Sequence, residues 1–292
     1  MNISISDKVF NGTVLFILAV IALLMLFPFY YVFVVSFTSP IEYLQKSMVL
    51  FPDTWTLTSY KYLLANNVFI NATGISTFLA VVGTALSLIV TSAGAYTLSR
   101  KRLQGRRIIL ILILMTTLFN PGIIPPYLVV RELGLINSIW ALIIPVLTSG
   151  WYVILMKGFF ESIPDELEEA AKIDGASDIG IFLRIILPLS LPSLAAFGLF
   201  YAVAYWNTFF SAILYINRAD IRPLQVVLQM LLIDSSSSSS GDMANMMSSE
   251  VQIPTDTLKM AAIVISTVPI LLVYPFLQKH FAKGVMVGSI KG

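Results

Sequence analysis

A polar segment between two long apolar stretches holds the residues in this chain that are best suited to recognition chemistry. Its characteristic positions keep fixed spacings: Glu169, Ala170, Ala171, Gly175, Ile185, Leu187 and Pro188. A carboxylate beside two small side chains offers an ionic contact and lets a helix approach another surface closely. We therefore expect this segment to contact a partner protein. A solvated acidic helix is the alternative, and it does not explain the spacing of the glycine and the proline.

Catalysis by the chain itself is not expected. The sequence contains no cysteine and a single histidine, His280, which excludes thiol chemistry, disulfides and most histidine-based sites. It also lacks the G-x-x-x-x-G-K-[ST] loop that holds nucleotide phosphates. We predict no catalytic residue, no metal site and no cofactor in this chain.

The composition indicates that lipid is the main solvent. Hydrophobic residues make up 57% of the 292 residues and charged residues 12%, which is about half of the charged fraction usual in soluble domains. The mean hydropathy is +0.86. A net charge of +2 is too small to favour binding to nucleic acid.

Six stretches contain no Asp, Glu, Lys or Arg, and each is long enough for a membrane helix, which needs roughly 20 residues. We predict an all-α integral membrane protein with one transmembrane domain over residues 1–292. The expected spans lie near residues 14–37, 72–99, 108–130, 133–156, 189–216 and 260–278. No cleavage signal typical of a secretory leader follows the first stretch, so we expect it to remain as a span.

The basic residues predict the orientation. If both termini are cytoplasmic, 12 Lys and Arg fall on cytoplasmic segments and 6 on outer segments, which accounts for all 18. Basic residues are enriched on the cytoplasmic side of membrane proteins, so we expect cytoplasmic termini and a cytoplasmic Glu169 segment. Residues 38–71 and 218–259 are then the large outer segments.

The outer loop of residues 218–259 contains a serine run at residues 235–240. Such runs are too polar to form a core, which favours a flexible linker. Long loops are also often functional, which favours contact with an external partner. The sequence leaves both readings open.

Helix signals divide residues 161–188 into a helix, a turn and a second helix. Ser162 suits the cap of the first helix and Pro164 its first turn. Gly175 suits a left-handed C-terminal stop. Ser177 suits the cap of the second helix, which we expect to break at Pro188 before the fifth span.

The complete pattern E-A-A-x3-G-x9-I-x-L-P resembles the coupling motif of membrane subunits of binding-protein-dependent ABC importers. Residues 125–137, 158–192 and 283–292, together with Trp206-Asn207, resemble more narrowly the carbohydrate-uptake permeases of the maltose-permease second-subunit type. The C-terminal half is similar to permeases for oligosaccharides or polysaccharides, including the smaller membrane subunit of an alginate importer. Thr208 departs from the Glu that is frequent in the family.

The resemblance implies a type I ABC importer permease that imports sugar by alternating access across the bacterial inner (cytoplasmic) membrane. The implied partners are a second permease in a heterodimer, two cytoplasmic ATPase subunits that bind ATP and Mg, and an external solute-binding protein. The residues that would couple to the ATPase are Glu169, Ala170, Ala171, Asp174, Gly175, Leu187 and Pro188. A C-terminal tail that reaches the ATPase would include Gly284, Gly288, Lys291 and Gly292; a frayed basic end is the alternative for this tail.

Aromatic and amide side chains are candidates for the sugar path, because aromatic faces stack on pyranose rings and amides hydrogen-bond to hydroxyls. The candidates are Asn120, Tyr127, Tyr201, Tyr205, Trp206, Asn207, Phe209 and Phe210. Aromatic residues in membrane helices also serve packing and the interfacial belts, so each candidate has that second reading.

The main alternative function is an ion-coupled secondary transporter subunit. Such proteins usually keep ionisable residues within the membrane, and the six stretches contain none, although sodium sites can be built from backbone carbonyls. An intramembrane hydrolase is disfavoured because the chain lacks a G-x-S-x-G elbow. A membrane anchor without transport does not explain the complete coupling motif.

Overall fold

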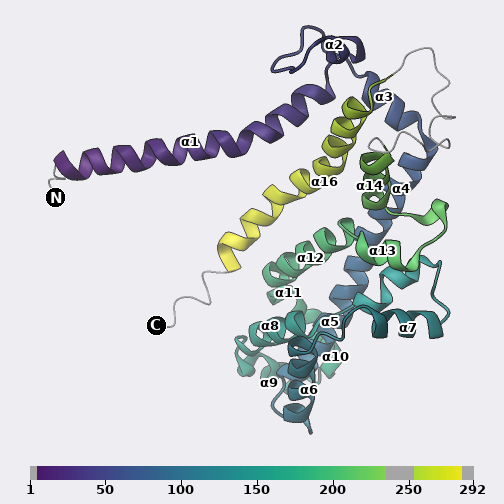
Figure 1. The fold of residues 1–292 in the computed structure, drawn as a ribbon. Helices are drawn as coiled ribbons and strands as arrows, with labels where there is room; N and C mark the ends of the chain where they lie inside the picture. The colour runs from purple at the N-terminus through teal and green to yellow at the C-terminus, as the bar shows by residue number, and fades with distance from the viewer. Residues whose placement is uncertain (1–4, 235–252, 285–292) are drawn as a thin grey trace. The chain divides into compact units, whose positions relative to one another are not determined.

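The computed structural model describes residues 5–234 and 253–284, and it describes side chains for residues 10–233 and 253–273. In this part of the chain the regular structure is helical (Figure 1), and the only strand-like pairing is an isolated bridge between Thr38 and Trp55. The expected all-α class is therefore confirmed. The chain divides into two compact units, unit 1 with residues 1–70 and 228–268, and unit 2 with residues 71–227 and 269–292. The single transmembrane domain expected from the sequence stays a prediction.

Unit 1 is built around the C-terminal end of the first helix, α1. Its helices are α1 (Ile5–Ser36), α2 (Pro40–Gln45), α3 (Thr58–Ala65) and the beginning of α16 (Thr255–Gly284). The Ser36 and Tyr60 hydroxyls lie 2.8 Å apart, and the Phe37 ring packs on Tyr60 with 4.8 Å between centroids. These interactions join the end of α1 to α3.

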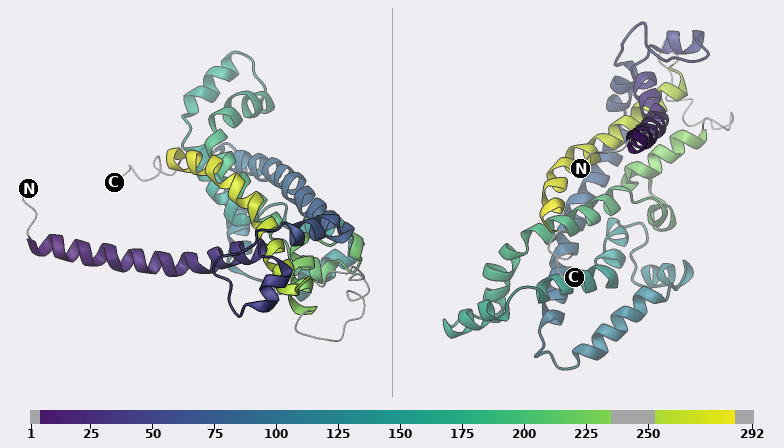
Figure 2. Two further views of the ribbon diagram at one scale, coloured as in Figure 1. Left: turned by 90° about the horizontal axis from the view of Figure 1, so that it is seen from above. Right: turned by 90° about the vertical axis from the view of Figure 1, so that its left-hand side faces the viewer.

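Unit 2 is built on one long helical run. It consists of α4 (Asn67–Phe78), the π-helical turn η1 (Leu79–Gly83) and α5 (Thr84–Ser99), and Figure 2 shows it from two further directions. This run packs against α8 (Gly150–Glu161) and α12 (Leu191–Trp206). Small residues permit the close approach, as in other membrane helix pairs. A Cβ on Gly83 would lie 2.7 Å from the Tyr205 ring, and one on Gly198 would lie 3.3 Å from the Leu88 side chain.

The remaining helices of unit 2 are short. They are α6 (Arg106–Leu118), α7 (Ile124–Glu132), η2 (Ile139–Leu142), η3 (Ile144–Val146), α9 (Asp165–Ile173), α10 (Asp178–Ile181), η4 (Phe182–Ile186), α11 (Leu187–Leu189), α13 (Phe210–Tyr215), η5 (Ala219–Ile221) and the start of α14 (Leu224–Asp234).

Three helices in the described residues are long and apolar enough to cross a membrane: Phe10–Ser36, Asn67–Ser99 and Thr255–Val273. Two bent pairs raise the number to five if each pair is one span. They are Ile139–Val146 with Gly150–Glu161, bent by 51°, and Asp178–Leu189 with Leu191–Trp206, bent by 82°. The predicted count of six spans is not confirmed and stays a prediction.

The expected third span, residues 108–130, is not one helix. Helix α6 has 13 residues, about 20 Å at 1.5 Å per residue, which is less than the roughly 30 Å of hydrocarbon in a bilayer. The chain breaks after Leu118 because Pro121 has no amide hydrogen for a helix, and Gly122 has a left-handed φ of 78°. Helix α7 then begins at Ile124, with Pro125 in its first turn.

Candidate functional site

The polar segment folds as the predicted helix, turn and second helix. The first helix, α9, is followed by Gly175, which has a left-handed φ of 80°. The Ser177 hydroxyl accepts a hydrogen bond from the Gly180 amide at 3.2 Å and caps α10. Both of these predictions are confirmed.

Two boundary predictions are wrong. Ser162 does not cap α9; it follows the last residue of α8, and its hydroxyl donates to the Phe159 carbonyl at 2.7 Å. Pro164 is the residue before α9 instead, because its fixed φ of −56° suits a helix entry. The bend before α12 lies at Ser190, not at Pro188, because the helical backbone continues from η4 through Pro188 to Leu189 and α12 begins at Leu191.

Helix α9 presents two different faces. Glu168 and Ala171 are buried, and Ala171 belongs to a hydrophobic core with Met156, Phe160 and Ile181. Glu169 and Ala170 are exposed, and Ile173 is 87% exposed. Residues three or four positions apart share one face of a helix, which accounts for this division. The coupling candidates Asp174, Gly175 and Pro188 are also exposed, and Leu187 is half-buried.

The buried face of α9 is held by ion pairs to the loop after α5. The Arg100 guanidinium contacts the Glu168 carboxylate, and both side chains are at most 10% exposed. Glu168 also pairs with Lys172 at 2.8 Å and with Arg102 at 3.3 Å. Arg102 in turn pairs with Asp178 at 2.6 Å, and this hydrogen bond raises the pKa of Arg102.

Arg100 and Glu168 were not among the site residues predicted from the sequence. A weak signal was available, because Glu168 stands one position before the motif carboxylate and a basic cluster begins at Arg100. The count of basic residues predicted only the orientation of the chain in the membrane. Which acid meets which base depends on the path of α8, and that path is a tertiary property.

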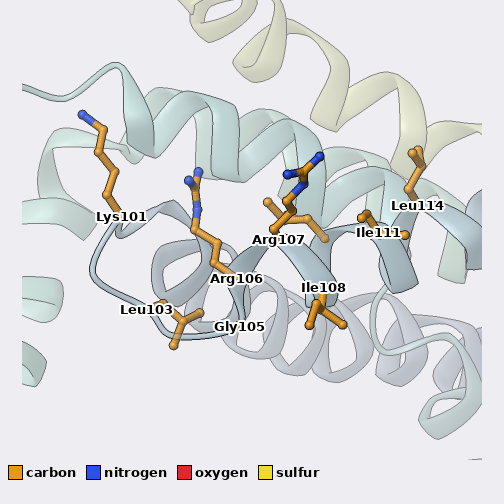
Figure 3. A pocket seen from close by; sticks show the side chains of 9 residues that line it. Lys101, Leu103, Gly105, Arg106, Arg107, Ile108, Ile111 and Leu114 are labelled. Atoms are coloured by element: carbon orange, nitrogen blue, oxygen red, sulfur yellow. The ribbon is translucent and has the colours of Figure 1, made fainter.

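An open groove of about 670 Å³ lies along the same loop and the first turns of α6. Figure 3 shows that Lys101, Arg106 and Arg107 point the same way along its rim, with Ile111 and Leu114 further along the helix. The Arg106 guanidinium forms an ion pair with Glu161 and donates a hydrogen bond to the Leu98 carbonyl. The described residues include no group of three or more His, Cys, Asp or Glu side chains that could hold a metal ion.

The predicted sugar-path residues fall into two groups. Tyr201, Tyr205 and Trp206 are buried within the chain. The Tyr201 hydroxyl lies 2.7 Å from that of Thr91, and the Tyr205 hydroxyl lies 2.9 Å from that of Ser87. These tyrosines therefore join α12 to α5 in this conformation.

The other candidates lie at or near the surface. Asn120, Asn207 and Phe210 are exposed, whereas Tyr127 and Phe209 are half-buried. The Asn207 amide donates to the Val203 carbonyl at 2.9 Å, and its oxygen accepts from Gln225 at 3.4 Å. The Tyr127 ring stacks on that of Tyr215 with 6.4 Å between centroids.

Asn137 is a further polar residue, and it lies beside the segment that follows α13. It has a φ of 62°, and its side-chain oxygen accepts from the amides of Asn217 at 2.6 Å and Arg218 at 3.2 Å. It therefore fixes the loop after α7 to the end of α13. Gly288, Lys291 and Gly292 of the predicted ATPase-contact tail, and the serine run at residues 235–240, lie outside the described residues, and Gly284 is the last residue of α16.

A comparison with known families identifies the chain. Residues 4–287 match the family described as binding-protein-dependent transport system inner membrane component. The chain belongs to this family. It is therefore a membrane component of a binding-protein-dependent transport system, and the family resemblance noted in the sequence is confirmed.

Two relatives from Bacillus subtilis (strain 168) align with this permease over nearly their whole length. The polygalacturonan/rhamnogalacturonan transport system permease protein YtcP is 46% identical over 98% of this chain and 99% of its own. Protein LplC is 46% identical over 98% of this chain and 96% of its own.

Solved structures agree on the fold. A chain of a bacterial ABC transporter involved in the import of the acidic polysaccharide alginate superposes with a TM-score of 0.88 and 33% identity, over 95% of this permease and 98% of that chain. A chain of a bacterial alginate ABC transporter in complex with an alginate-bound periplasmic protein has a TM-score of 0.57, over 96% of this permease and 97% of that chain. At 14% identity it shows the fold alone.

Proposed function

We propose that this permease is one of two membrane subunits of an ATP-driven importer for an oligosaccharide or polysaccharide. In this proposal two cytoplasmic ATPase subunits bind ATP and Mg, an external solute-binding protein delivers the sugar, and both termini are cytoplasmic. The permease supplies the translocation path and performs no hydrolysis.

The observation that best supports the proposal is the exposed face of α9. Glu169, Ala170 and Ile173 lie on this face, and Ile179 on α10 is 72% exposed. Exposed aliphatic residues beside a carboxylate suit a protein interface better than they suit water. Ala171 faces the chain's own core, so its proposed contribution to docking is indirect and consists of positioning the exposed face.

The relatives support the proposed substrate class. The permease protein YtcP is described as a transporter of polygalacturonan and rhamnogalacturonan, and the structural neighbour as an importer of alginate. The alginate importer is described as importing an acidic polysaccharide, and polygalacturonan is a polymer of galacturonate, so we extend the class of acidic polysaccharides to this chain. The exposed candidates Asn207 and Phe210 can contact sugar in this conformation, whereas Tyr201 and Tyr205 would need α12 to separate from α5.

Reconstitution tests the proposal. This permease is co-expressed with the second permease, the ATPase and the binding protein of the same transport system, and the purified complex is placed in proteoliposomes that contain ATP. Uptake of a labelled galacturonate or alginate oligosaccharide should require both ATP and the binding protein. Failure of the intact chain to form a complex with the ATPase would contradict the proposal.

A further inference from the structure

We propose that the buried Arg100–Glu168 ion pair is the positioning link by which α9 moves α5 during the transport cycle. The proposal rests on the proposed function, because it requires an ATPase that docks on α9. It assigns to these two residues a role different from that of Glu169, which lies on the exposed face.

Arg100 connects three helices through one side chain. It stands directly after α5, and its guanidinium contacts Glu168 of α9. The same guanidinium lies 3.4 Å from the carbonyl oxygen of Phe160 in α8 and 4.7 Å from the centroid of the Tyr96 ring in α5. Its Nε donates to the Ser99 hydroxyl at 3.0 Å. A planar guanidinium held at all these points has one orientation.

Glu168 completes the link on the other side. One of its carboxylate oxygens pairs with Lys172 and Arg102, and the other pairs with Arg100. Because Arg102 also pairs with Asp178, the helices on both sides of the Gly175 turn are tied to the same loop. The turn is therefore held at two points and moves as one piece with the end of α5.

Burial makes this link stiffer than the other ion pairs of the cluster. Exposed pairs contribute little because water competes for both partners, and this applies to Lys101 with Asp165, whose side chains are 83% and 66% exposed. Separating the pair removes the buried Arg100 guanidinium from its nearest carboxylate, which is unfavourable because a buried charge needs a close partner. Packing of Ala171 alone permits sliding, whereas the charged pair holds α9 and α5 at one separation.

The far end of the link reaches the candidate sugar path. Helix α5 continues from Ser99 back to Thr91 and Ser87, whose hydroxyls contact those of Tyr201 and Tyr205 on α12. Movement of α9 that displaces α5 must therefore change or carry along these contacts. The path from α9 to α12 therefore runs through the Arg100–Glu168 pair, the helix α5 and the hydroxyl contacts of Thr91 and Ser87.

The experiment uses the full complex in proteoliposomes and measures sugar transported per ATP hydrolysed. The main variant is the neutral pair R100Q/E168Q, which removes both charges and leaves no uncompensated charge in the core. We expect the variant complex to assemble and to hydrolyse ATP, with a loss of at least tenfold in transport per ATP. The matched control is Lys101→Gln, which removes a cation of the same loop and should stay within twofold of the wild type.

A second variant guards against misfolding of the first. Arg100→Lys keeps the charge but loses the fork that contacts Glu168 and Phe160 together, so transport per ATP should fall several-fold in a complex that assembles. A wild-type ratio in either variant overturns the link, even if stability falls. If the wild-type complex itself neither assembles nor transports sugar, the proposed function fails instead, so the two failures are distinguishable.

Discussion

Ala170 and Ala171 are neighbours in the sequence, but Ala170 is exposed and Ala171 is buried. Ala171 packs in the core of unit 2, whereas Ala170 is exposed beside Ile173. The motif therefore combines one residue that holds the helix on its own chain with another that we propose faces the ATPase. The same chemical change at the two positions separates these roles.

Replacing each alanine with leucine should affect a different property of the permease, stability at one position and binding of the ATPase at the other. Ala171→Leu inserts three carbon atoms into a packed core and should lower the free energy of unfolding by about 1–3 kcal/mol. Ala170→Leu should change it by less than about 0.5 kcal/mol and should weaken co-purification of the ATPase. Thermal unfolding of the purified permease measures the first effect and pull-down the second. Equal loss of stability in both variants would contradict the division of faces.

Glu42 is the buried carboxylate of unit 1. It accepts hydrogen bonds from the amide of Asp53 at 2.8 Å, from the amide of Thr54 at 3.2 Å and from Lys46 at 2.9 Å. The Asp53 amide, followed by Lys46, lowers the pKa of Glu42 from 4.5 to about 2. The ionised side chain therefore ties the loop of residues 46–54 to α2.

This carboxylate predicts a pH dependence of stability. Because the pKa in the folded chain lies below the unfolded value of 4.5, the ionised form stabilises the fold above that pH, and the benefit disappears as the pH falls toward about 2. The difference in melting temperature between the wild type and Glu42→Gln should thus be constant from about pH 7 to pH 5.5 and should shrink below pH 4.5. Trp fluorescence during heating measures it. A difference that grows on acidification would exclude this role.

At the scale of elements, the run α4–η1–α5 decides how unit 2 packs. Its glycine at position 83 lies against the Tyr205 ring of α12, and Ser87 one turn later lies 2.9 Å from the hydroxyl of the same tyrosine. The Tyr205 ring can pack this closely because Gly83 has no Cβ. The π-helical turn η1 ends at that glycine.

Gly83→Ala should weaken the packing between α5 and α12. The new Cβ would lie 2.7 Å from the ring, so one helix must shift, at a cost of about 1–3 kcal/mol. The matched control is Gly94→Ala in α5, where a Cβ meets nothing within 4 Å and the helix gains up to about 1 kcal/mol of propensity. Unfolding by SDS titration compares the two variants. A loss of stability for Gly94→Ala equal to that for Gly83→Ala would contradict the assigned packing.

At the scale of the whole molecule, much of the apolar surface faces outward. The most apolar part of the first candidate span, within Phe10–Ser36, contains no buried residue, and neither does α6. A membrane subunit of a larger complex satisfies such surfaces with lipid and with partner helices. The orientation of the whole chain in the membrane is a property at this scale too, and the basic residues predict that both termini are cytoplasmic.

Cysteine labelling tests that orientation, because the natural chain has no cysteine. We expect Ser47→Cys to react with a membrane-impermeant maleimide added outside intact spheroplasts. Gln104→Cys should react only after the membrane is opened. Both positions are exposed in the structure, so lack of reaction reports on the membrane side. The reverse pattern would show that the termini are outside.

The sequence alone determined the apolar composition and the motif that carries the family resemblance, because these depend on residue content and on local spacing. Gly175 and Ser177 were predictable for the same reason, since their roles depend on the residues next to them. The tertiary structure decided that Ala171 and Glu168 face inward, that Tyr201 and Tyr205 contact α5, and that Arg100 meets Glu168. Each of these depends on which distant helix lies opposite a given face, and no local pattern specifies that.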